Sequence, residues 1–561
     1  MQSGIHATEM ILFLLLLFVA AFATLARKLR TPYPIILVIA GLVLSFVPGI
    51  PRVRLNPEMV FVVVLPPLLY SAAWLTSWRD FYYNLVSIFL LAFGLVGFTV
   101  VGVAAVAHLV FPGFDWRLGV VLGAVVAPTD AIAATAIARR VGLPRRIVDV
   151  LEGESLVNDA TALLALEFGL SLVSGNGVPS VAGGLLRLAY LVIAGLAVGL
   201  LLGAVVYWFE KRVDDGRVES VISLLVPYAA YLGAESIHAS GVLSVVTCGL
   251  YLSRRSPTFF SPSVRMRVNA LWNSLTFILN GLIFVLIGLQ MHYVASGIRG
   301  YGMSKLIFLG VLFSAAVIVL RLIWSFPGAR VAHFMRTRFL GQKQDPPSWR
   351  GSFVVGWTGM RGVIALAAAM SLPEVLQDGA AFPQRNLIIF LTFCVILVTL
   401  VLQGLTLPPL IRALGLAGDS GTEQEEEEEA RRAMVRAALD YLEAAGEREK
   451  EEAQAADGGN AKPDNDGHGM TEIYDDLASH YQHQLTSLAA EHEAGHDGSN
   501  RRGHYAKFLE ASREVLAVER EKIIALRDQG RISDEVLRRL QTELDLNETR
   551  LLLADAEELE E

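Results

Sequence analysis

The chain has 561 residues, of which 53 % are hydrophobic, and it carries 47 Lys and Arg against 55 Asp and Glu. This apolar fraction excludes an ordinary soluble protein. The charges are divided unevenly: residues 1–413 hold 30 basic and 18 acidic side chains, which leaves 17 basic and 37 acidic ones for residues 414–561. We therefore expect a transmembrane domain over 1–413 and an acidic, helical, cytoplasmic regulatory domain over 414–561.

The first apolar run, from Met10 to Leu25, has its basic residues after it rather than before it. This order favours a retained first helix with its start outside over a cleaved signal peptide. The two cysteines, Cys248 and Cys394, both lie in apolar segments. They are interpreted as packing residues rather than as part of a disulfide framework.

Hydropathy predicts about thirteen membrane-spanning helices. Their approximate limits are 9–27, 32–49, 57–76, 82–111, 116–139, 147–173, 182–210, 218–236, 239–253, 267–291, 304–327, 351–373 and 385–413. With the N-terminus outside, most basic loop residues fall on the cytoplasmic side, in agreement with the positive-inside rule. An odd number of spans then places the acidic C-terminal region in the cytoplasm.

The fifth span is interrupted near its middle by Ala127-Pro128-Thr129-Asp130. Proline removes a backbone donor and clashes with the preceding turn, so the helix is expected to break there. Carbonyls freed inside a membrane need protein groups, water or a bound ion as partners. A plain proline kink with a satisfied Asp130 is the alternative.

The sixth span carries Glu154-Ser155-Leu156-Val157-Asn158-Asp159 in an otherwise apolar stretch. At 3.6 residues per turn, Glu154, Ser155, Asn158 and Asp159 fall on one side of the helix. An ionisable group at the bilayer centre costs several kcal/mol, so it is expected to line a pathway rather than to face lipid. Two such carboxylates could hold a hard cation, protons, or each in turn.

The twelfth span contains a second interruption, Gly356-Trp357-Thr358-Gly359-Met360-Arg361-Gly362. Paired interrupted segments in two halves of a chain indicate the binding site of a secondary transporter. Spans five and twelve are seven apart, which suits two inverted six-helix repeats joined by one helix. Arg361 needs a buried partner, and Glu154 is expected to be that partner. The alternative is an arginine bonded to the carbonyls of its own broken helix. Arg321, at mid-span, has no partner that the sequence indicates.

Four segments resemble the electroneutral branch of the cation–proton antiporter superfamily, which includes prokaryotic Na⁺/H⁺ antiporters and animal sodium/hydrogen exchangers. They are Ala127–Asp130, Glu154–Asp159, Gly359–Gly362, and the stretch from Ala234-Glu235 through Ser240-Gly241 to Cys248-Gly249. In this family an Asn-Asp pair, here Asn158-Asp159, accompanies one-for-one exchange, whereas the branch with an Asp-Asp pair tends to be electrogenic.

The resemblance implies a role for each matching residue. Asp159 would carry the cation and the proton, Ser155 and Thr129 would supply oxygen ligands for Na⁺, and Asp130 would act through water. Glu154 would lie beside the ion, tied to Asn158 and Arg361, with Pro128 in the break. It also implies thirteen helices in two bundles, a core that moves like an elevator, and a homodimer in the lipid bilayer.

The leading hypothesis is thus a Na⁺(Li⁺)/H⁺ antiporter of the cell membrane and not an enzyme. K⁺/H⁺ exchange remains open, because these ligands do not encode the size of the cavity. A cation or pH sensor that signals through the C-terminal region is a further alternative. An intramembrane aspartyl protease is disfavoured, since neither Asp130 nor Asp159 has a Gly-x-Gly-Asp context. No nucleotide loop, cofactor motif or nucleic-acid motif is found.

Overall fold

The computed structural model describes most of the N-terminal 417 residues and a few positions beyond them. The described residues are 2–29, 31–47, 56–111, 114–174, 181–213, 215–291, 294, 302–342, 346–376, 379–417, 436–437, 439–448, 516, 519, 522, 525, 529, 544 and 546. The chain divides into two compact units, Met1–Ser420 and Gly421–Glu561. The helical patterns of the C-terminal region fall largely outside the described residues.

Helices account for nearly all regular structure in the first unit, and the described part of the chain contains no strand beyond one isolated bridge, Val375–Ala381. The α-helices are α1 (Gln2–Lys28), α2 (Tyr33–Leu44), α3 (Pro57–Met59), α4 (Leu65–Leu75), α5 (Trp78–Phe89), α6 (Val96–Val110), α7 (Trp116–Val126), α8 (Ala131–Val141), α9 (Arg145–Val173), α10 (Val181–Glu210), α11 (Gly216–Ser236), α12 (Gly241–Phe259), α13 (Pro262–Leu289), α15 (Met303–Phe339), α16 (Trp349–Trp357), α17 (Val363–Met370), α18 (Arg385–Val398) and α19 (Gly404–Ala413). Three π-helical stretches are inserted: η1 (Val60–Val64), η2 (Leu90–Leu95) and η3 (Thr399–Gln403). The all-helical membrane fold is confirmed.

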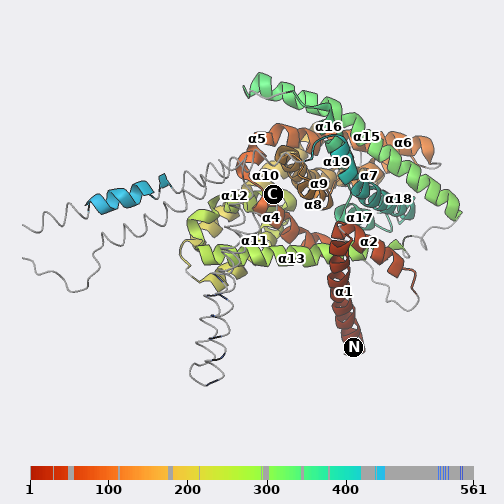
Figure 1. The fold of residues 1–561 in the computed structure, drawn as a ribbon. Helices are drawn as coiled ribbons and strands as arrows, with labels where there is room; N and C mark the ends of the chain where they lie inside the picture. Colours follow the sequence, from red (N-terminus) through yellow and green to blue (C-terminus); the bar gives the residue numbers. More distant parts are fainter. Residues whose placement is uncertain are drawn as a thin grey trace, which may run out of the picture. The chain divides into compact units, whose positions relative to one another are not determined.

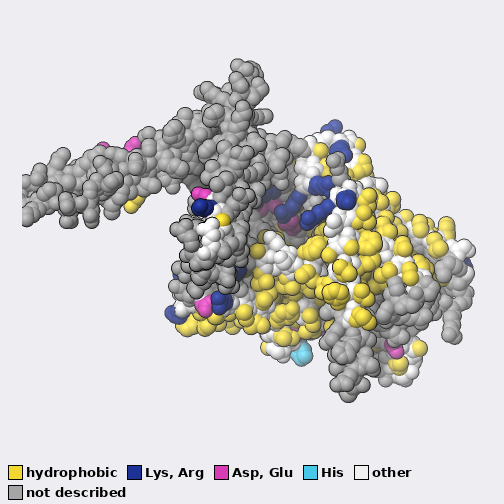
Figure 2. Space-filling view, turned by 60° about the horizontal axis from the view of Figure 1, so that its bottom comes forward, with side chains coloured by type: hydrophobic (Ala, Val, Ile, Leu, Met, Phe, Trp, Pro, Cys, Tyr) yellow, Lys and Arg dark blue, Asp and Glu magenta, His cyan; other side chains and the backbone are white. Residues whose placement is uncertain are grey.

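Each of the thirteen expected ranges contains a helix or a broken helix. Seven helices in the described part are long and apolar enough to cross a membrane on their own, and the bent pair α7–α8 makes an eighth. The outer surface agrees with this, because a broad face is covered by apolar side chains (Figure 2). Leu201, Ile193 and Phe308 are each about two-thirds exposed. The number thirteen and the inverted repeat stay predictions.

Both expected interruptions are confirmed. The α7 and α8 segments are bent by 42° at residues 127–130. Asp130 caps α8, since its Oδ1 accepts a hydrogen bond of 2.8 Å from the Ile132 N–H. The α16 and α17 segments are separated by residues 358–362. Each break thus ends one half-helix and begins another at mid-membrane, where free backbone groups are most costly.

The helices of the first unit, whose arrangement Figure 1 shows, pack around two large buried hydrophobic clusters and a small third one. The larger one joins α2, α6, α7, α8, α13 and α17 to α19, and the second joins α4, α11, α12 and the first half of α13. The broken helices both belong to the first cluster. The candidate site therefore lies in the part of the first unit that holds the larger hydrophobic cluster.

The π-helix η1 has a cause in the sequence that hydropathy does not reveal. It directly precedes Pro66 and Pro67 in α4. Proline at position 67 has no N–H for the carbonyl four residues before it, that of Val63. The Tyr228 hydroxyl of α11 donates to this carbonyl at 3.0 Å. A tyrosine from another helix thus satisfies the acceptor that the proline leaves open.

Helices α2 and α13 pack with their backbones in close contact through two glycines. A Cβ added at Gly41 would lie 2.5 Å from the Val285 carbonyl oxygen, and one added at Gly288 would lie 2.4 Å from that of Val38. Small residues at such crossings let membrane helices gain van der Waals contact.

We expect Gly41→Ala to lower the thermal unfolding temperature in detergent, because the methyl group forces the two backbones apart at a cost of about 1–3 kcal/mol. Gly97→Ala is the matched control, since a Cβ there meets nothing within 4 Å. It should leave stability unchanged or raise it by up to about 1 kcal/mol. Equal stability of both variants would contradict the close packing.

Candidate cation and proton site

The two interrupted helices cross, and each satisfies backbone groups of the other. The Asp130 N–H donates to the Met360 carbonyl at 2.9 Å, and the Arg361 Nε–H donates to the Val126 carbonyl at 2.8 Å. A Cβ at Gly362 would lie 2.1 Å from Asp130 Oδ2, so only glycine allows this approach. The crossing therefore has no need of water to pair these groups.

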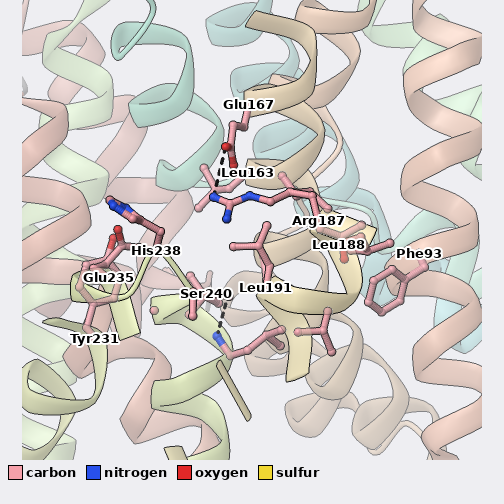
Figure 3. A pocket seen from close by; sticks show the side chains of 18 residues that line it. Phe93, Leu163, Glu167, Arg187, Leu188, Leu191, Tyr231, Glu235, His238 and Ser240 are labelled. Carbon is pink, nitrogen blue, oxygen red and sulfur yellow. Dashed lines mark hydrogen bonds and ion pairs between the residues drawn. The ribbon is translucent and has the colours of Figure 1, made fainter. Parts of the chain in front are cut away.

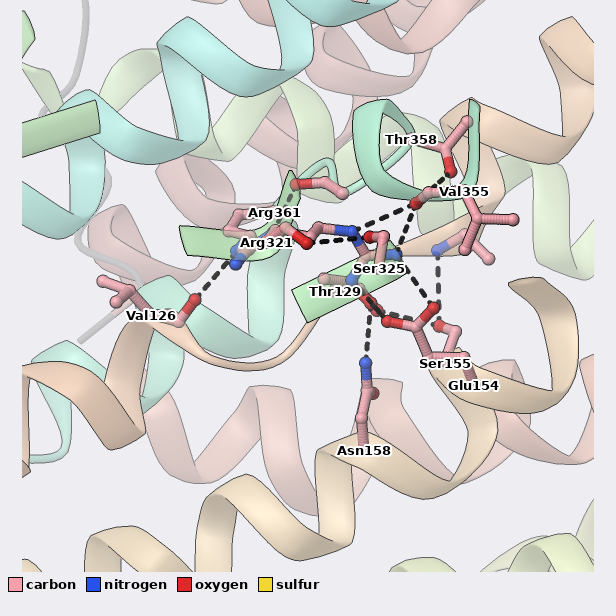
Figure 4. Close-up of polar contacts among 12 residues, drawn as sticks. Val126, Thr129, Glu154, Ser155, Asn158, Arg321, Ser325, Val355, Thr358 and Arg361 are labelled. Atoms are coloured by element: carbon pink, nitrogen blue, oxygen red, sulfur yellow. Dashed lines mark hydrogen bonds and ion pairs between the residues drawn. The ribbon is translucent and has the colours of Figure 1, made fainter. Parts of the chain in front are cut away.

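Helix α9 passes the first break and attaches to it through three polar side chains (Figure 4). The Ser155 hydroxyl donates to the Thr129 carbonyl at 3.0 Å and accepts from the Ala131 N–H at 3.3 Å. The Asn158 Nδ2 donates to Thr129 Oγ1 at 2.6 Å. The Thr129 hydroxyl in turn donates to Glu154 Oε1 at 3.1 Å.

These bonds join Glu154, Ser155 and Asn158 to the break, and the other expected residues are buried or half-buried as well. Glu154, Asn158, Asp159 and Thr129 are between 1 and 6 % exposed. Pro128 is buried within the break itself, as the sequence indicates. The half-buried Asp130 lies beside them at the start of α8.

The expected Glu154–Arg361 pair is wrong, because Glu154 pairs with Arg321 of α15. Arg321 donates to both carboxylate oxygens of Glu154, at 2.5 and 2.8 Å, and the side chains are at most 2 % exposed. Its guanidinium also donates to the Val355 carbonyl at 3.1 Å. A bidentate pair with further hydrogen bonds is the arrangement in which buried charges are best compensated.

Arg361 instead bonds to backbone carbonyls, which was the alternative that the sequence left open. Its guanidinium reaches the carbonyls of Val126 and Gly359. Its own N–H donates to Thr399 Oγ1 of η3 at 3.1 Å. Thr399 was missed by the sequence analysis, because a threonine in an apolar span gives no signal of its own. Arg361 thus joins the two breaks rather than neutralising a carboxylate.

Asp159 differs from Glu154 in having no committed partner. It is 3 % exposed, and none of the hydrogen bonds or ion pairs found among the described residues reaches its carboxylate. The Asn158 Oδ1 beside it is also buried without a hydrogen-bond partner in the described part of the chain. Asp130 is close enough to interact with Asp159 electrostatically. A buried carboxylate in such surroundings gains most from a cation or a proton.

The donor set suits an alkali cation. Carboxylate, hydroxyl, amide and carbonyl oxygens are the ligands that hard cations prefer. Ser155, Thr129 and Glu154 place oxygens of these kinds at the break, although both Glu154 oxygens already accept bonds from Arg321, and the Asp159 carboxylate follows Asn158 on α9. Among the described residues, no group of three or more His, Cys, Asp or Glu is placed to hold a metal ion.

Broken helices that cross at mid-membrane around buried carboxylates define a secondary ion transporter. Comparison with known families makes this specific: the family described as "Sodium/hydrogen exchanger, transmembrane" matches residues 13–413. The chain belongs to this sodium/hydrogen exchanger family and is a multi-pass membrane protein.

Relatives and solved structures agree with this assignment. An uncharacterized Na⁺/H⁺ exchanger of Mycobacterium tuberculosis is 33 % identical over 542 residues, which cover 95 % of this chain and 94 % of that protein. The Na⁺/H⁺ antiporter ApNhaP of Aphanothece halophytica is 34 % identical over 392 residues, covering 70 % and 71 %. The sodium proton antiporter MjNhaP1 of Methanocaldococcus jannaschii shares the fold, with a TM-score of 0.57 at 22 % identity over 72 % of this chain and all of that one.

We expect Arg321→Gln to destabilise the protein by about 3–5 kcal/mol, because it leaves the Glu154 charge buried without its partner. Adding Glu154→Gln should recover a large part of this loss, whereas the same second change should not rescue Arg361→Gln. The measurement is a double-mutant cycle on thermal unfolding in detergent. Coupling of Glu154 to Arg361 rather than to Arg321 would contradict the observed pairing.

Proposed function

We propose that this protein exchanges Na⁺ or Li⁺ for H⁺ across the cell membrane, with the two ions competing for the Asp159 carboxylate. The observation that carries the proposal is the contrast between two buried carboxylates on one helix. Glu154 is held by Arg321, while Asp159 has no protein partner among the described residues. Only an uncommitted carboxylate can bind and release its ion in each cycle.

Competition for one site is sufficient for exchange. An empty, ionised site is costly to move through the membrane, whereas a site neutralised by either Na⁺ or H⁺ crosses cheaply. The site is therefore moved from one membrane face to the other only when Na⁺ or H⁺ is bound to it. In this scheme Ser155, Thr129 and Glu154 supply oxygens to Na⁺ beside Asp159, and Asp130 acts through water.

The charges of the site favour one-for-one exchange. Glu154 and Arg321 cancel as a pair, and the charges of Arg361 and Asp130 sum to zero when both are ionised, although the two side chains do not pair. Asp159 then leaves one negative charge on the empty site, and either Na⁺ or H⁺ brings it to zero. Movement of the loaded site would carry no net charge in either direction, so exchange would not respond to voltage.

The movement itself is expected to be of the elevator type. The family resemblance implies a mobile bundle that carries the site past a second bundle, which forms a homodimer. The N-terminus would lie outside, and the acidic region 414–561 would regulate exchange from the cytoplasm. The buried core has two large clusters and a small third one, and the separation of the two large ones supports a division into bundles.

Potassium is a second candidate substrate. A relative from Bacillus subtilis, described as a sodium, potassium, lithium and rubidium/H⁺ antiporter, is 32 % identical over 392 residues and covers 68 % of this chain. The oxygen donors around Asp159 do not by themselves select between the two ions.

We expect Asp159→Asn to abolish exchange, because the amide can neither titrate nor balance a cation. The test measures collapse of a pH gradient in proteoliposomes on addition of Na⁺ or Li⁺, with voltage clamped by valinomycin, and on addition of K⁺ without valinomycin. Glu152→Gln is the matched control, since Glu152 lies on the same helix in a partly exposed pair with Arg139. It should cost at most about 1 kcal/mol and preserve exchange.

Collapse by Na⁺ or Li⁺ that is lost in Asp159→Asn would support the assignment. Robust Na⁺-dependent proton flux in that variant would remove Asp159 from the carrier role. Collapse by K⁺ alone would change the substrate to potassium.

A further inference from the structure

The property that singles out Asp159 is shared by one other carboxylate. The described part of the chain contains four carboxylates that are almost completely buried: Glu154, Asp159, Glu210 and Glu219. Glu154 pairs with Arg321, whereas the side chain of Glu210 makes no hydrogen bond or ion pair among the described residues. Its Oε2 atom is buried without a partner there. A buried carboxylate of this kind is strongly unfavourable unless a counter-charge neutralises it.

Glu167 of α9 shows what a carboxylate near the surface has instead. It is 60 % exposed and lies 3.5 Å from Arg187 of α10. Both residues line a cavity of about 280 Å³ between α9, α10 and the turn that joins α11 to α12 (Figure 3). Water screens exposed pairs of this kind, so neither charge requires a further ligand. Glu210 has neither solvent nor a basic partner in the described part of the chain.

Glu210 and Glu219 lie on the two sides of the connection between α10 and α11. Glu210 is the last residue of α10, and Glu219 is in the first turn of α11. The two residues are 2 and 3 % exposed, and their carboxylates are close enough to interact electrostatically. The C-terminus of a helix carries partial negative charge, which disfavours a carboxylate and favours a cation. The two carboxylates and the end of α10 thus form a buried, negatively charged group.

The basic side chains around this connection are directed elsewhere. Lys211 and Arg212, which follow Glu210, lie over aromatic rings of the preceding turn, at 4.7 and 3.9 Å from the ring centroids. Arg267 of α13 lies beside Gly216, where an added Cβ would be 3.0 Å from a guanidinium nitrogen. None of these three side chains forms an ion pair with Glu210 in the part of the chain that the structure describes. The positive charge that Glu210 requires is therefore not supplied by them.

Hydroxyl groups lie beside Glu210 at the second hydrophobic cluster. The Ser223 hydroxyl of α11 accepts a hydrogen bond of 2.9 Å from Trp272 Nε1, and the Tyr70 hydroxyl of α4 interacts with both Ser223 and Glu210. All three of these neighbours are at most 4 % exposed. Carboxylate and hydroxyl oxygens are ligands that hard cations prefer. With only two carboxylates, this donor set suits a singly charged ion better than Ca²⁺, whose protein sites use more carboxylate oxygens.

We propose that Glu210 and Glu219 form a second cation site, which binds Na⁺ or K⁺ as a structural ion and does not transport it. The ion would neutralise Glu210 and join the ends of α10 and α11 to the second hydrophobic cluster. This site does not depend on the exchange function proposed above, because it shares no residue with the crossing of the two broken helices. An ion bound only by the folded protein stabilises it, by an amount that grows with the logarithm of the ion concentration.

The test measures the thermal unfolding temperature of Asp159→Asn in detergent, so that the proposed transport carboxylate is absent. NaCl or KCl replaces N-methyl-D-glucamine chloride at constant ionic strength, at about pH 8, where ordinary carboxylates are ionised. We expect the unfolding temperature to rise by about 2–5 °C as either salt replaces the organic cation. Adding Glu210→Gln should abolish this rise. It should also raise the unfolding temperature in the cation-free buffer, because the uncompensated buried charge is gone.

Glu152→Gln is the matched control, since Glu152 lies in a partly exposed pair with Arg139, and it should keep the full cation dependence. Glu219→Gln leaves Glu210 in place and should raise the half-saturating cation concentration by about 10- to 100-fold. This second variant tests the site even if Glu210→Gln does not fold.

Three results would overturn the second site. They are an unfolding temperature of Asp159→Asn that does not respond to Na⁺ or K⁺, a response that survives Glu210→Gln, and stabilisation by Mg²⁺ or by acid at about pH 6 in place of the alkali cations. Exchange by the single variant Glu210→Gln in proteoliposomes should match that of the wild type. Failure of this site is thereby distinguished from failure of the Asp159 assignment.

Discussion

The structure depends on one constraint, which is that two helices are interrupted in the middle of a membrane and must satisfy their backbone groups there. They do so by crossing, with Asp130 bonded to the Met360 carbonyl and Arg361 bonded to the Val126 carbonyl. Gly362 permits the close approach of the two breaks, and the Thr399 hydroxyl of η3 accepts a hydrogen bond from the Arg361 N–H in the second break. Ser155 and Asn158 can then attach α9 to the first break.

This constraint decides how the buried charges are divided. Arg361 donates its side-chain hydrogen bonds to backbone carbonyls at the crossing of the two broken helices, so it does not pair with Glu154. Glu154 is neutralised instead by Arg321 of α15. Because Glu154 is satisfied by Arg321 and Thr129, it stabilises the site. Asp159, five residues later on the same helix, is left without such a partner among the described residues.

Much of this could be predicted from local sequence. Three features act within a few residues of their own position: Pro128, the polar face from Glu154 to Asp159, and the glycines around Arg361. Their effects on where a helix breaks and which way it faces can therefore be derived from the sequence. The Arg321–Glu154 pair could not, because it joins residues 167 apart and depends on how α15 is rotated against α9. The π-helix η1 was missed for a related reason: the carbonyl of Val63 is satisfied by a distant side chain, that of Tyr228.

The two groups of charges on α9 differ in what solvent does to them. The Glu154–Arg321 pair is sealed from water, so its charges are poorly screened and its pairing is permanent. The Glu167–Arg187 pair is half exposed, so salt and competing cations weaken it. A site that must release its ion cannot hold it as firmly as Arg321 holds Glu154. Helix α9 thus carries in order a sealed ion pair, a buried carboxylate without a partner among the described residues, and an exposed pair that water screens.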